Sequence, residues 1–249
     1  MSEPLHGLRV VDFSFGIACA YCAKLLGDAG ADVVKVEPLE GDVGRFPRPN
    51  RSPDMGAGFL NTNRNKRSIA IDMATAEGQA LIRELAAQAD VLVESFAPRV
   101  IPALGLDYDT LRQANPRLVV ASVSNFGQTG PYRDYKLSEI VLYAMGGTMQ
   151  ATGTSDREPV KLALTAEQFF CGGVSATATM GAHLGSLVDG EGQHLDIALF
   201  DAVIAVRNAR PPAPYTQEPH ESSAPACSHG HHFSVVLKRL NVPLYTSSM

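Results

Sequence analysis

The chain has 249 residues and a formal net charge of −5, because its 26 aspartates and glutamates outnumber its 21 lysines and arginines. This acidic balance argues against a nucleic-acid-binding protein, since such proteins carry a basic surplus. Hydrophobic residues make up 45% of the chain, as in globular proteins that bury a core, but there is no run of 18 apolar residues, so no membrane span is predicted.

Strands and helices are predicted to alternate along residues 5–206. The predicted strands are residues 8–13, 32–37, 69–71, 91–93, 118–123 and 194–198, and the predicted helices include residues 18–29 and 75–89. Gly30 ends the first helix and Thr75 caps the second. The short connections favour parallel strand pairs. The pattern predicts an α/β domain with a doubly wound, mostly parallel sheet and helices on both faces, a Rossmann-like fold.

Two stretches depart from this alternation. Residues 38–66 are polar and rich in proline and glycine, and a loop of that length is usually functional or contains short elements of its own. Residues 207–249 hold six of the 16 prolines and four of the seven histidines and show no helical or strand period. We therefore predict one domain over residues 5–206 and an irregular Pro/His-rich tail over residues 207–249.

The N-terminal residues and the four cysteines predict a cytoplasmic protein without a disulfide framework. Residues 1–4 lack the charged leader of a secretory signal, and four cysteines are too few to staple a chain of this length. Cys19 and Cys22 form a C-x-x-C pair, but no second pair completes a zinc site, so no metal is expected. We interpret both as packing residues, with a thioredoxin-like redox role as the alternative.

Seven short segments, in a fixed order, carry a family pattern. They are residues 10–14 (VVDFS), 25–38 (LLGDAGADVVKVEP), 63–68 (NRNKRS), 90–96 (DVLVESF), 115–117 (NPR), 126–132 (FGQTGPY) and 190–197 (GEGQHLDI). Together they resemble the class III CoA-transferase family, which includes formyl-CoA transferase and the carnitine CoA-transferases. The resemblance implies an acyl-CoA:carboxylate CoA-transferase whose partners are an acyl-CoA and a small carboxylic acid, with coenzyme A as substrate and no tightly bound cofactor.

Full-length members of this family add a smaller second domain and form homodimers whose two chains interlock. We expect this chain to correspond to the N-terminal large domain alone, with the small domain absent and the interlocked dimer incomplete. The family also includes α-methylacyl-CoA racemases, so the resemblance specifies a CoA thioester more firmly than it specifies a reaction.

The first turn after a strand is where a doubly wound sheet presents its ligand site. Here that turn is residues 14–18, whose small residues let a ligand approach the backbone, and it lacks the G-x-G-x-x-G pattern of nicotinamide-binding proteins. The resemblance implies that coenzyme A contacts Ile17, Ala18, Ile71, Asp72, Ser95, Phe96 and Lys136. The alternatives are tight packing for the small residues of the turn and simple solvation for Lys136.

The resemblance implies that an aspartate near the start of a long helix attacks the thioester, a covalent step for which that carboxylate must be ionised. When the sequence is aligned with the family on Gly172, the position of that aspartate holds Gln168, whose neutral amide is a poor nucleophile. Thr165-x-x-Gln168 fits a capping box, so we expect Gln168 to cap the helix. The alternative is that Gln168 orients a substrate or that Glu167, about 100° away around the helix, replaces the aspartate.

Glu139 is a second acid at a position where relatives also carry one. It could accept a hydrogen bond or act as a general base, and the alternative is simple solvation or helix capping. The racemases tend to place a His-Asp pair here, and Ser138-Glu139 lacks the histidine. We therefore rank a CoA-transferase first, an inert fragment or pseudoenzyme with residual CoA binding second, and a racemase-like isomerase last.

Overall fold

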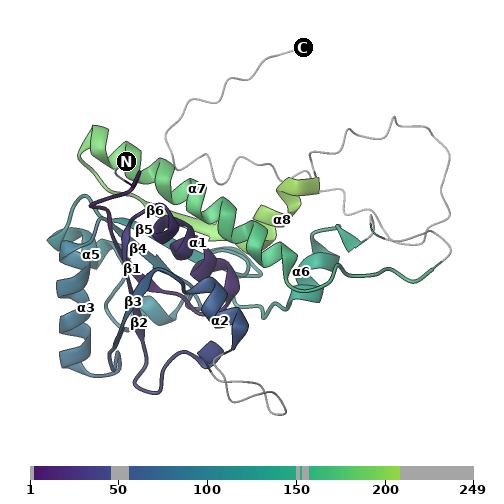
Figure 1. Ribbon diagram of the computed structural model, residues 1–249, viewed down its shortest axis with the longest axis horizontal. Coiled ribbons are helices and arrows are strands. Elements are labelled where there is room, and N and C mark those ends of the chain that lie inside the picture. The colour runs from purple at the N-terminus through teal and green to yellow at the C-terminus, as the bar shows by residue number, and fades with distance from the viewer. Residues whose placement is uncertain (1–2, 46–55, 150–151, 153–156, 208–249) are drawn as a thin grey trace.

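A wholly parallel sheet lies at the centre of the chain (Figure 1). The computed structural model describes residues 3–45, 56–149, 152 and 157–207. The strands of this part are β1 (Arg9–Phe13), β2 (Asp32–Glu37), β3 (Lys66–Ala70), β4 (Val91–Glu94), β5 (Val119–Ser124) and β6 (His194–Ala198). Their order, β3-β2-β1-β4-β5-β6, is that of the doubly wound dinucleotide-binding fold. The predicted fold class is confirmed.

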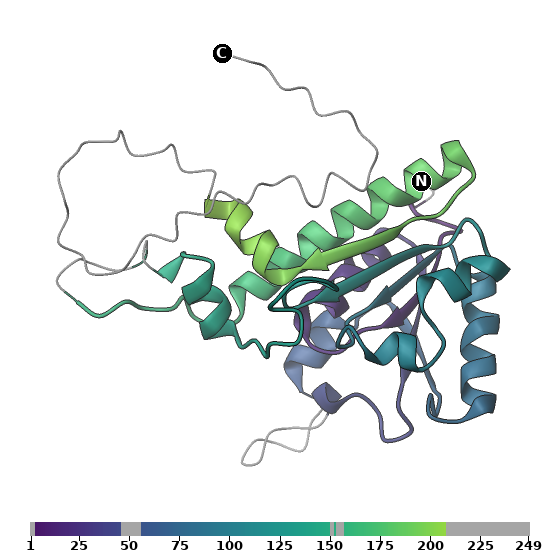
Figure 2. The same ribbon diagram turned by 180° about the vertical axis from the view of Figure 1, so that it is seen from behind.

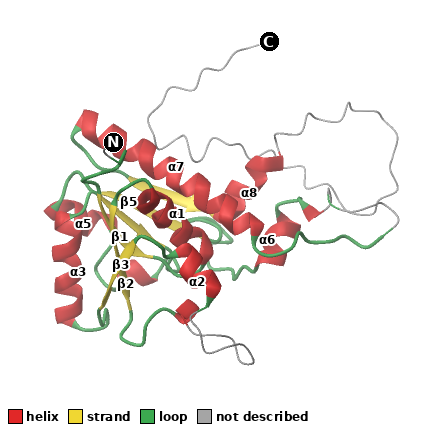
Figure 3. Cartoon of the chain, viewed as in Figure 1, coloured by secondary structure: helices red, strands yellow, loops and turns green. Residues whose placement is uncertain are grey.

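Helices cover both faces of this sheet, as Figure 3 shows by element type. The helices on one face are α1 (Ile17–Asp28), α7 (Ala166–Asp189), α6 (Glu139–Met145) and α8 (Leu199–Arg207), and those on the other are α3 (Ala76–Gln88), α4 (Val100–Ala103) and α5 (Tyr108–Ala114). Successive side chains of a strand point to opposite faces, so Val10 packs in the α1/α7 layer and Val11 in the α3/α5 layer. Seen from behind in Figure 2, α7 lies along the β6 edge of the sheet.

Small residues bring α1 and α7 into close contact. A Cβ atom on Gly172 of α7 would lie 2.6 Å from the Ala18 carbonyl oxygen of α1, so only glycine fits there. Cys19 and Cys22 are buried in the same layer, and burial raises the pKa of the Cys22 thiol to about 12. Both side chains are therefore packed as neutral thiols, which favours the packing interpretation over a redox pair.

Several predicted boundaries shift in the structure. β3 covers residues 66–70 instead of 69–71, because its register pairs Lys66 with Val33 and Ala70 with Glu37. The predicted cap at Thr75 is confirmed, since its hydroxyl accepts a hydrogen bond from the Gly78 amide at 3.0 Å. Within the described residues, no helix combines the length and apolar character needed to cross a membrane.

The long loop contains short elements of its own. They are the 3-10 turn η1 (Val43–Arg45) and the helix α2 (Ala57–Thr62), both of which pack near the carboxyl end of β2. Residues 46–55 lie outside the described part. The predicted irregular tail beyond Arg207, with Cys227 and the histidines near residue 230, also lies outside it.

Candidate functional site

A cavity of about 390 Å³ opens at the carboxyl end of the sheet. It lies where the strand order reverses between β1 and β4, the place where open α/β sheets bind their ligands. Its wall comes from the β1–α1 turn, the β4–α4 loop, the end of β5 and the loop that follows, with single residues from α7 and α8. Six of the ten residues expected to form the site line it: Ile17, Ala18, Ser95, Phe96, Lys136 and Gln168.

The other four expected residues lie outside this lining. Ile71 is buried in the α3/α5 layer, and the Asp72 carboxylate accepts a hydrogen bond from the Ala74 amide beside the start of α3. Both follow β3, which is two strands away from β1, so their role in CoA binding stays a prediction. Glu139 and Glu167 lie behind Gln168 at the start of α7.

Hydrogen bonds to buried side chains fix the β1–α1 turn in one shape. The Asp12 carboxylate accepts from the Ser14 amide at 2.8 Å, and the Lys35 ammonium donates to the Ser14 carbonyl at 2.7 Å. The Ser95 hydroxyl, from the β4 side, accepts from the Phe15 amide at 2.7 Å and lies 2.9 Å from the Phe15 carbonyl. Gly16 then turns the chain into α1 with φ of 77°, a conformation that favours glycine.

Two buried ion pairs hold in place the side chains that bond the β1–α1 turn. The Lys35 ammonium lies 2.9 Å from the Asp42 carboxylate, with side-chain exposures of 2% and 8%. The Lys66 ammonium lies 2.7 Å from the Asp12 carboxylate, with side-chain exposures of 1% and 0%. Because each buried charge has an opposite charge and further hydrogen bonds, the desolvation cost of both pairs is offset. The first pair joins β2 to the segment just before η1, and the second pair joins β3 to β1.

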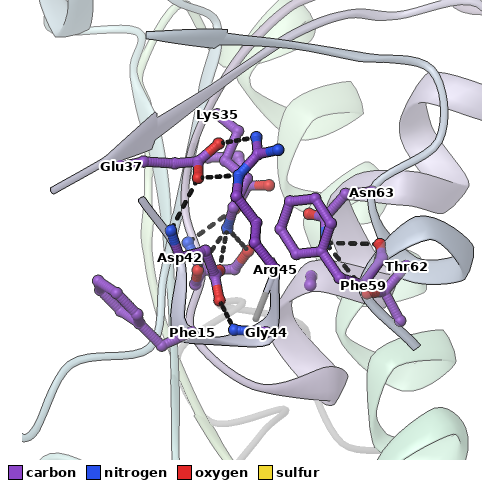
Figure 4. A network of polar contacts seen from close by, with 12 residues as sticks. Phe15, Lys35, Glu37, Asp42, Gly44, Arg45, Phe59, Thr62 and Asn63 are labelled. Atoms are coloured by element: carbon purple, nitrogen blue, oxygen red, sulfur yellow. Dashed lines mark hydrogen bonds and ion pairs between the residues drawn. The ribbon is translucent and has the colours of Figure 1, made fainter. Parts of the chain in front are cut away.

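A third ion pair lies beside them, as Figure 4 shows. The Arg45 Nε atom donates to Glu37 Oε2 at 2.6 Å, and the guanidinium lies 4.3 Å from the centroid of the Phe59 ring. Burial alone would raise the pKa of Glu37, but hydrogen bonds from Arg45, Ser68 and the Asp42 amide outweigh it and lower this pKa to about 2. Glu37 is therefore ionised throughout the physiological range.

Glu139 of α6 caps the start of α7. One of its carboxylate oxygens accepts from the Glu167 amide and the other from the Gln168 Nε2 atom, both at 3.1 Å. A carboxylate is favourable there because it accepts from an unpaired amide and complements the helix dipole. The predicted capping box is wrong: Thr165 makes no side-chain cap hydrogen bond, and Gln168 reaches Glu139 instead of the helix backbone.

Neither candidate on α7 presents a carboxylate to the cavity. Gln168 lines it as a neutral amide. Glu167 is only 7% exposed, and burial together with the negative charge of Glu139 raises its pKa. Among the described lining residues, Asp134 supplies a carboxylate, but hydrogen bonds from Arg99 hold it at the surface.

Glu94 ends β4 beneath the loop that lines the cavity. It is 3% exposed, and its carboxylate accepts from the Phe96 amide at 2.7 Å. Burial raises its pKa to about 7, against the opposing hydrogen bonds from Ser122 and the Phe96 amide. A buried acid that titrates near neutral pH therefore holds the backbone of a cavity residue.

The sequence interpretation missed Lys35, Asp42 and Glu94. Lys35 stands inside an apolar strand segment and Glu94 at the end of one, and a charge in such a place is itself a signal of a buried, partnered group. The described residues hold no group of three or more His, Cys, Asp or Glu side chains that could bind a metal ion.

Comparisons with known proteins agree with this architecture. The sequence profile of CoA-transferase family III matches residues 5–234. A solved structure of a CAIB/BAIF family protein from Brucella suis is 40% identical and superposes with a TM-score of 0.78, over 83% of this chain and 56% of that one. The profile match extends past residue 206, so the domain boundary there stays a prediction.

Two curated relatives are similar at comparable levels. Succinate–glutarate CoA-transferase from Agrobacterium fabrum is 40% identical over 210 residues, which is 82% of this chain and 52% of that protein. The beta subunit of succinyl-CoA–L-malate CoA-transferase from Chloroflexus aurantiacus is 37% identical over 237 residues, which is 92% of this chain and 58% of that protein. The chain thus spans about half the length of these relatives, and it belongs to CoA-transferase family III.

Proposed function

We propose that this chain binds an acyl-CoA in the cavity and serves the transfer of CoA from that thioester to a small carboxylic acid. The carrying observation is the position of the cavity at the carboxyl end of the sheet, between the β1–α1 turn and the first turn of α7. The names of the relatives, which pair succinate, glutarate or malate with CoA transfer, support the reaction class.

Charge, a helix N-terminus and the cavity volume support part of a CoA molecule as the ligand. Arg133 and Lys136 bring positive charge to the wall of the cavity, as phosphate groups require. The N-terminus of α1, where Gly16 offers no side-chain cap, favours a polar or negatively charged ligand group. A volume of about 390 Å³ accommodates only part of a CoA molecule, so we assign the cavity to the acyl-pantetheine arm. The residues that we propose to contact the ligand are Ile17, Ala18, Ser95, Phe96 and Lys136.

The covalent route of the family needs a carboxylate whose oxygen attacks the thioester carbonyl and displaces the CoA thiolate, which leaves a mixed anhydride. Gln168 cannot form that anhydride because its side chain is an amide. Its NH2 group is engaged by Glu139, so its carbonyl oxygen remains to orient a donor on the ligand. Glu167 would have to leave its buried position to attack. These features favour a second candidate function, acyl-CoA binding without covalent turnover.

One experiment separates the two candidates. The 249-residue chain is titrated with CoA and succinyl-CoA by calorimetry, and the complex with succinyl-CoA is treated with hydroxylamine and digested for mass spectrometry. A hydroxamate on Glu167 with transfer to an added acid supports the transferase. Micromolar binding without a hydroxamate supports binding alone, and no binding of either ligand contradicts both.

The Gln168→Asp variant tests the assignment of the attack position. Because this change supplies a carboxylate at the mouth of the cavity, we expect a hydroxamate on residue 168 that wild type does not form. Gln168→Asn is the matched control, since asparagine has the same length as aspartate but is neutral, and it should form no hydroxamate. Gln168→Asp that binds succinyl-CoA as tightly as wild type yet gives no adduct would show that residue 168 does not face the thioester.

A further inference from the structure

The Ser124 hydroxyl is an unused polar group in the cavity. Ser124 ends β5, lines the cavity and is 7% exposed. Its Oγ atom has no hydrogen-bond partner in the part of the chain that the structure describes. Five buried side-chain atoms of the described residues lack a hydrogen-bond partner, and of these only Ser124 Oγ belongs to a residue that lines the cavity.

Each of three neighbouring neutral side chains already makes at least one hydrogen bond within the protein. The Ser95 hydroxyl is bonded to the Phe15 backbone, the Asn125 amide donates to the Tyr135 carbonyl at 3.2 Å, and the Gln168 amide donates to Glu139. A buried hydroxyl that lacks a partner loses its hydration without compensation. Ser124 therefore supplies, among the described lining residues, a buried hydroxyl that remains available to a ligand.

Its neighbour on the same strand gives the contrast. Ser122 lies two residues earlier and so projects from the same face of β5. The Ser122 Oγ atom lies 2.9 Å from the His194 Nε2 atom, and this hydroxyl also hydrogen-bonds Glu94. The Ser122 hydroxyl therefore has hydrogen-bond partners within the protein, whereas the Ser124 hydroxyl at the cavity has none. This difference is expected if a ligand supplies the partner of Ser124.

We propose that the Ser124 hydroxyl donates a hydrogen bond to a carbonyl oxygen of the acyl-pantetheine arm of a bound acyl-CoA. This inference rests on the proposed function. The arm offers that chemistry from two sources, the pantetheine amides and the thioester itself. Ser124 is a ligand-contacting residue, and no covalent step is assigned to it.

The Ser124→Ala variant of the 249-residue chain tests the proposal through two measurements, ligand affinity and the melting temperature of the unliganded protein. The proposal predicts weaker binding without a loss of stability. We expect the dissociation constant for succinyl-CoA to rise about 5–10-fold, because one net hydrogen bond to the ligand is lost. The melting temperature of the unliganded protein should stay equal or rise, because the change removes a buried group without a partner. Ser122→Ala is the matched control, and it should lower the melting temperature because its hydroxyl is bonded.

Free CoA is the second ligand of the test. Equal weakening of CoA and succinyl-CoA binding assigns the bond to a pantetheine amide, and weakening of succinyl-CoA alone assigns it to the thioester carbonyl. Wild-type affinity for both ligands, or a fall in melting temperature like that of Ser122→Ala, overturns the inference. If wild type itself binds neither ligand, the proposed function fails. If wild type binds them and Ser124→Ala binds them with the same affinity, only the inference about Ser124 fails.

Discussion

The two halves of the sheet's carboxyl edge stabilise their buried acids in different ways. In the half formed by β1, β2 and β3, Asp12 pairs with Lys66 and Asp42 pairs with Lys35, and all four side chains are nearly inaccessible to solvent. In the half formed by β4, β5 and β6, the buried Glu94 is held by the Ser122 hydroxyl and the Phe96 amide. The cavity lies between these two arrangements.

A pair of glutamates makes the difference measurable. Glu37 ends β2 and Glu94 ends β4, and the two residues are only 2% and 3% exposed. Hydrogen bonds from Arg45 and Ser68 hold the pKa of Glu37 at about 2 against burial, whereas burial raises the pKa of Glu94 to about 7. A cationic partner therefore decides whether a buried acid stays ionised, and the β1–β3 half is the fixed scaffold while the β4–β6 half responds to protons near neutral pH.

The largest effect is expected from removing a charge in the β1–β3 half. Lys35→Met leaves the Asp42 carboxylate and the Ser14 carbonyl without their buried ammonium donor. Breaking a buried ion pair in this way costs about 3–5 kcal/mol. We expect the free energy of unfolding, measured in urea, to fall by that amount.

Two further variants sharpen this result. Lys35→Met combined with Asp42→Asn removes the orphaned charge and should recover most of the lost stability. Arg67→Met breaks the ion pair with Asp32 at the surface, where the side chains are 70% and 51% exposed, and should change stability by less than about 0.5 kcal/mol. Equal losses for Lys35→Met and Arg67→Met would remove the contrast between buried and exposed pairs.

The next effect belongs to the β4–β6 half and depends on pH. The folded pKa of Glu94, about 7, lies above its ordinary value of 4.5, so the folded state binds the proton more tightly and the contribution of Glu94 to stability falls as pH rises from 4.5 to 7. Glu94→Gln has no such proton to lose. At 1.36 kcal/mol per pKa unit, its stability relative to wild type should rise by roughly 3 kcal/mol between pH 4.5 and pH 8.

Urea unfolding of wild type and Glu94→Gln at several pH values measures this difference directly. Taking the difference between the two proteins cancels the titration of other acids, including Glu167, whose pKa is also raised by burial. A difference that does not vary between pH 4.5 and pH 8 would mean that folding does not raise the pKa of Glu94, and the β4–β6 half would then not respond to protons near neutral pH.

Much of the fold follows from local sequence patterns. β2 and β6 have the bounds predicted from their apolar runs, and the sheet is parallel as the short connections indicate. β3 was misplaced because it is an edge strand with exposed charged residues, Arg67 among them, and its bounds depend on pairing with β2. Hydrophobic pattern predicts buried strands better than edge strands for this reason.

The candidate site shows the same limit. Alignment on Gly172 puts Gln168 at the position of the family's attacking acid, which stays a prediction, and in the structure Gln168 lines the cavity. The capping box failed because the actual cap, Glu139, lies 29 residues before Gln168 in sequence, and a local motif carries no information on a contact of that range. The bonds of Lys35 to Ser14 and Asp42 were missed for a related reason, since a strand pattern shows burial but not the partner.

The smallest effect concerns the contact of α1 with α7, which joins the two halves behind the cavity. Gly172→Ala would place a Cβ atom 2.6 Å from the Ala18 carbonyl oxygen and 3.0 Å from Tyr21 atoms, so the helices must separate. Overpacking of this kind costs about 1–3 kcal/mol. Because Gln168 lies one helical turn before Gly172, the same shift should also displace it from the cavity and weaken succinyl-CoA binding.

Gly173→Ala is the matched control, because nothing lies within 4 Å of the added Cβ atom at the very next position of the same helix. Replacing this glycine should stabilise α7 by about 0.5–1 kcal/mol through the lower backbone entropy of alanine in the unfolded chain. Urea unfolding should therefore give opposite signs for two identical substitutions at adjacent positions. Stabilisation by both would show that α1 and α7 have room to spare, and that the position of Gln168 does not depend on their contact.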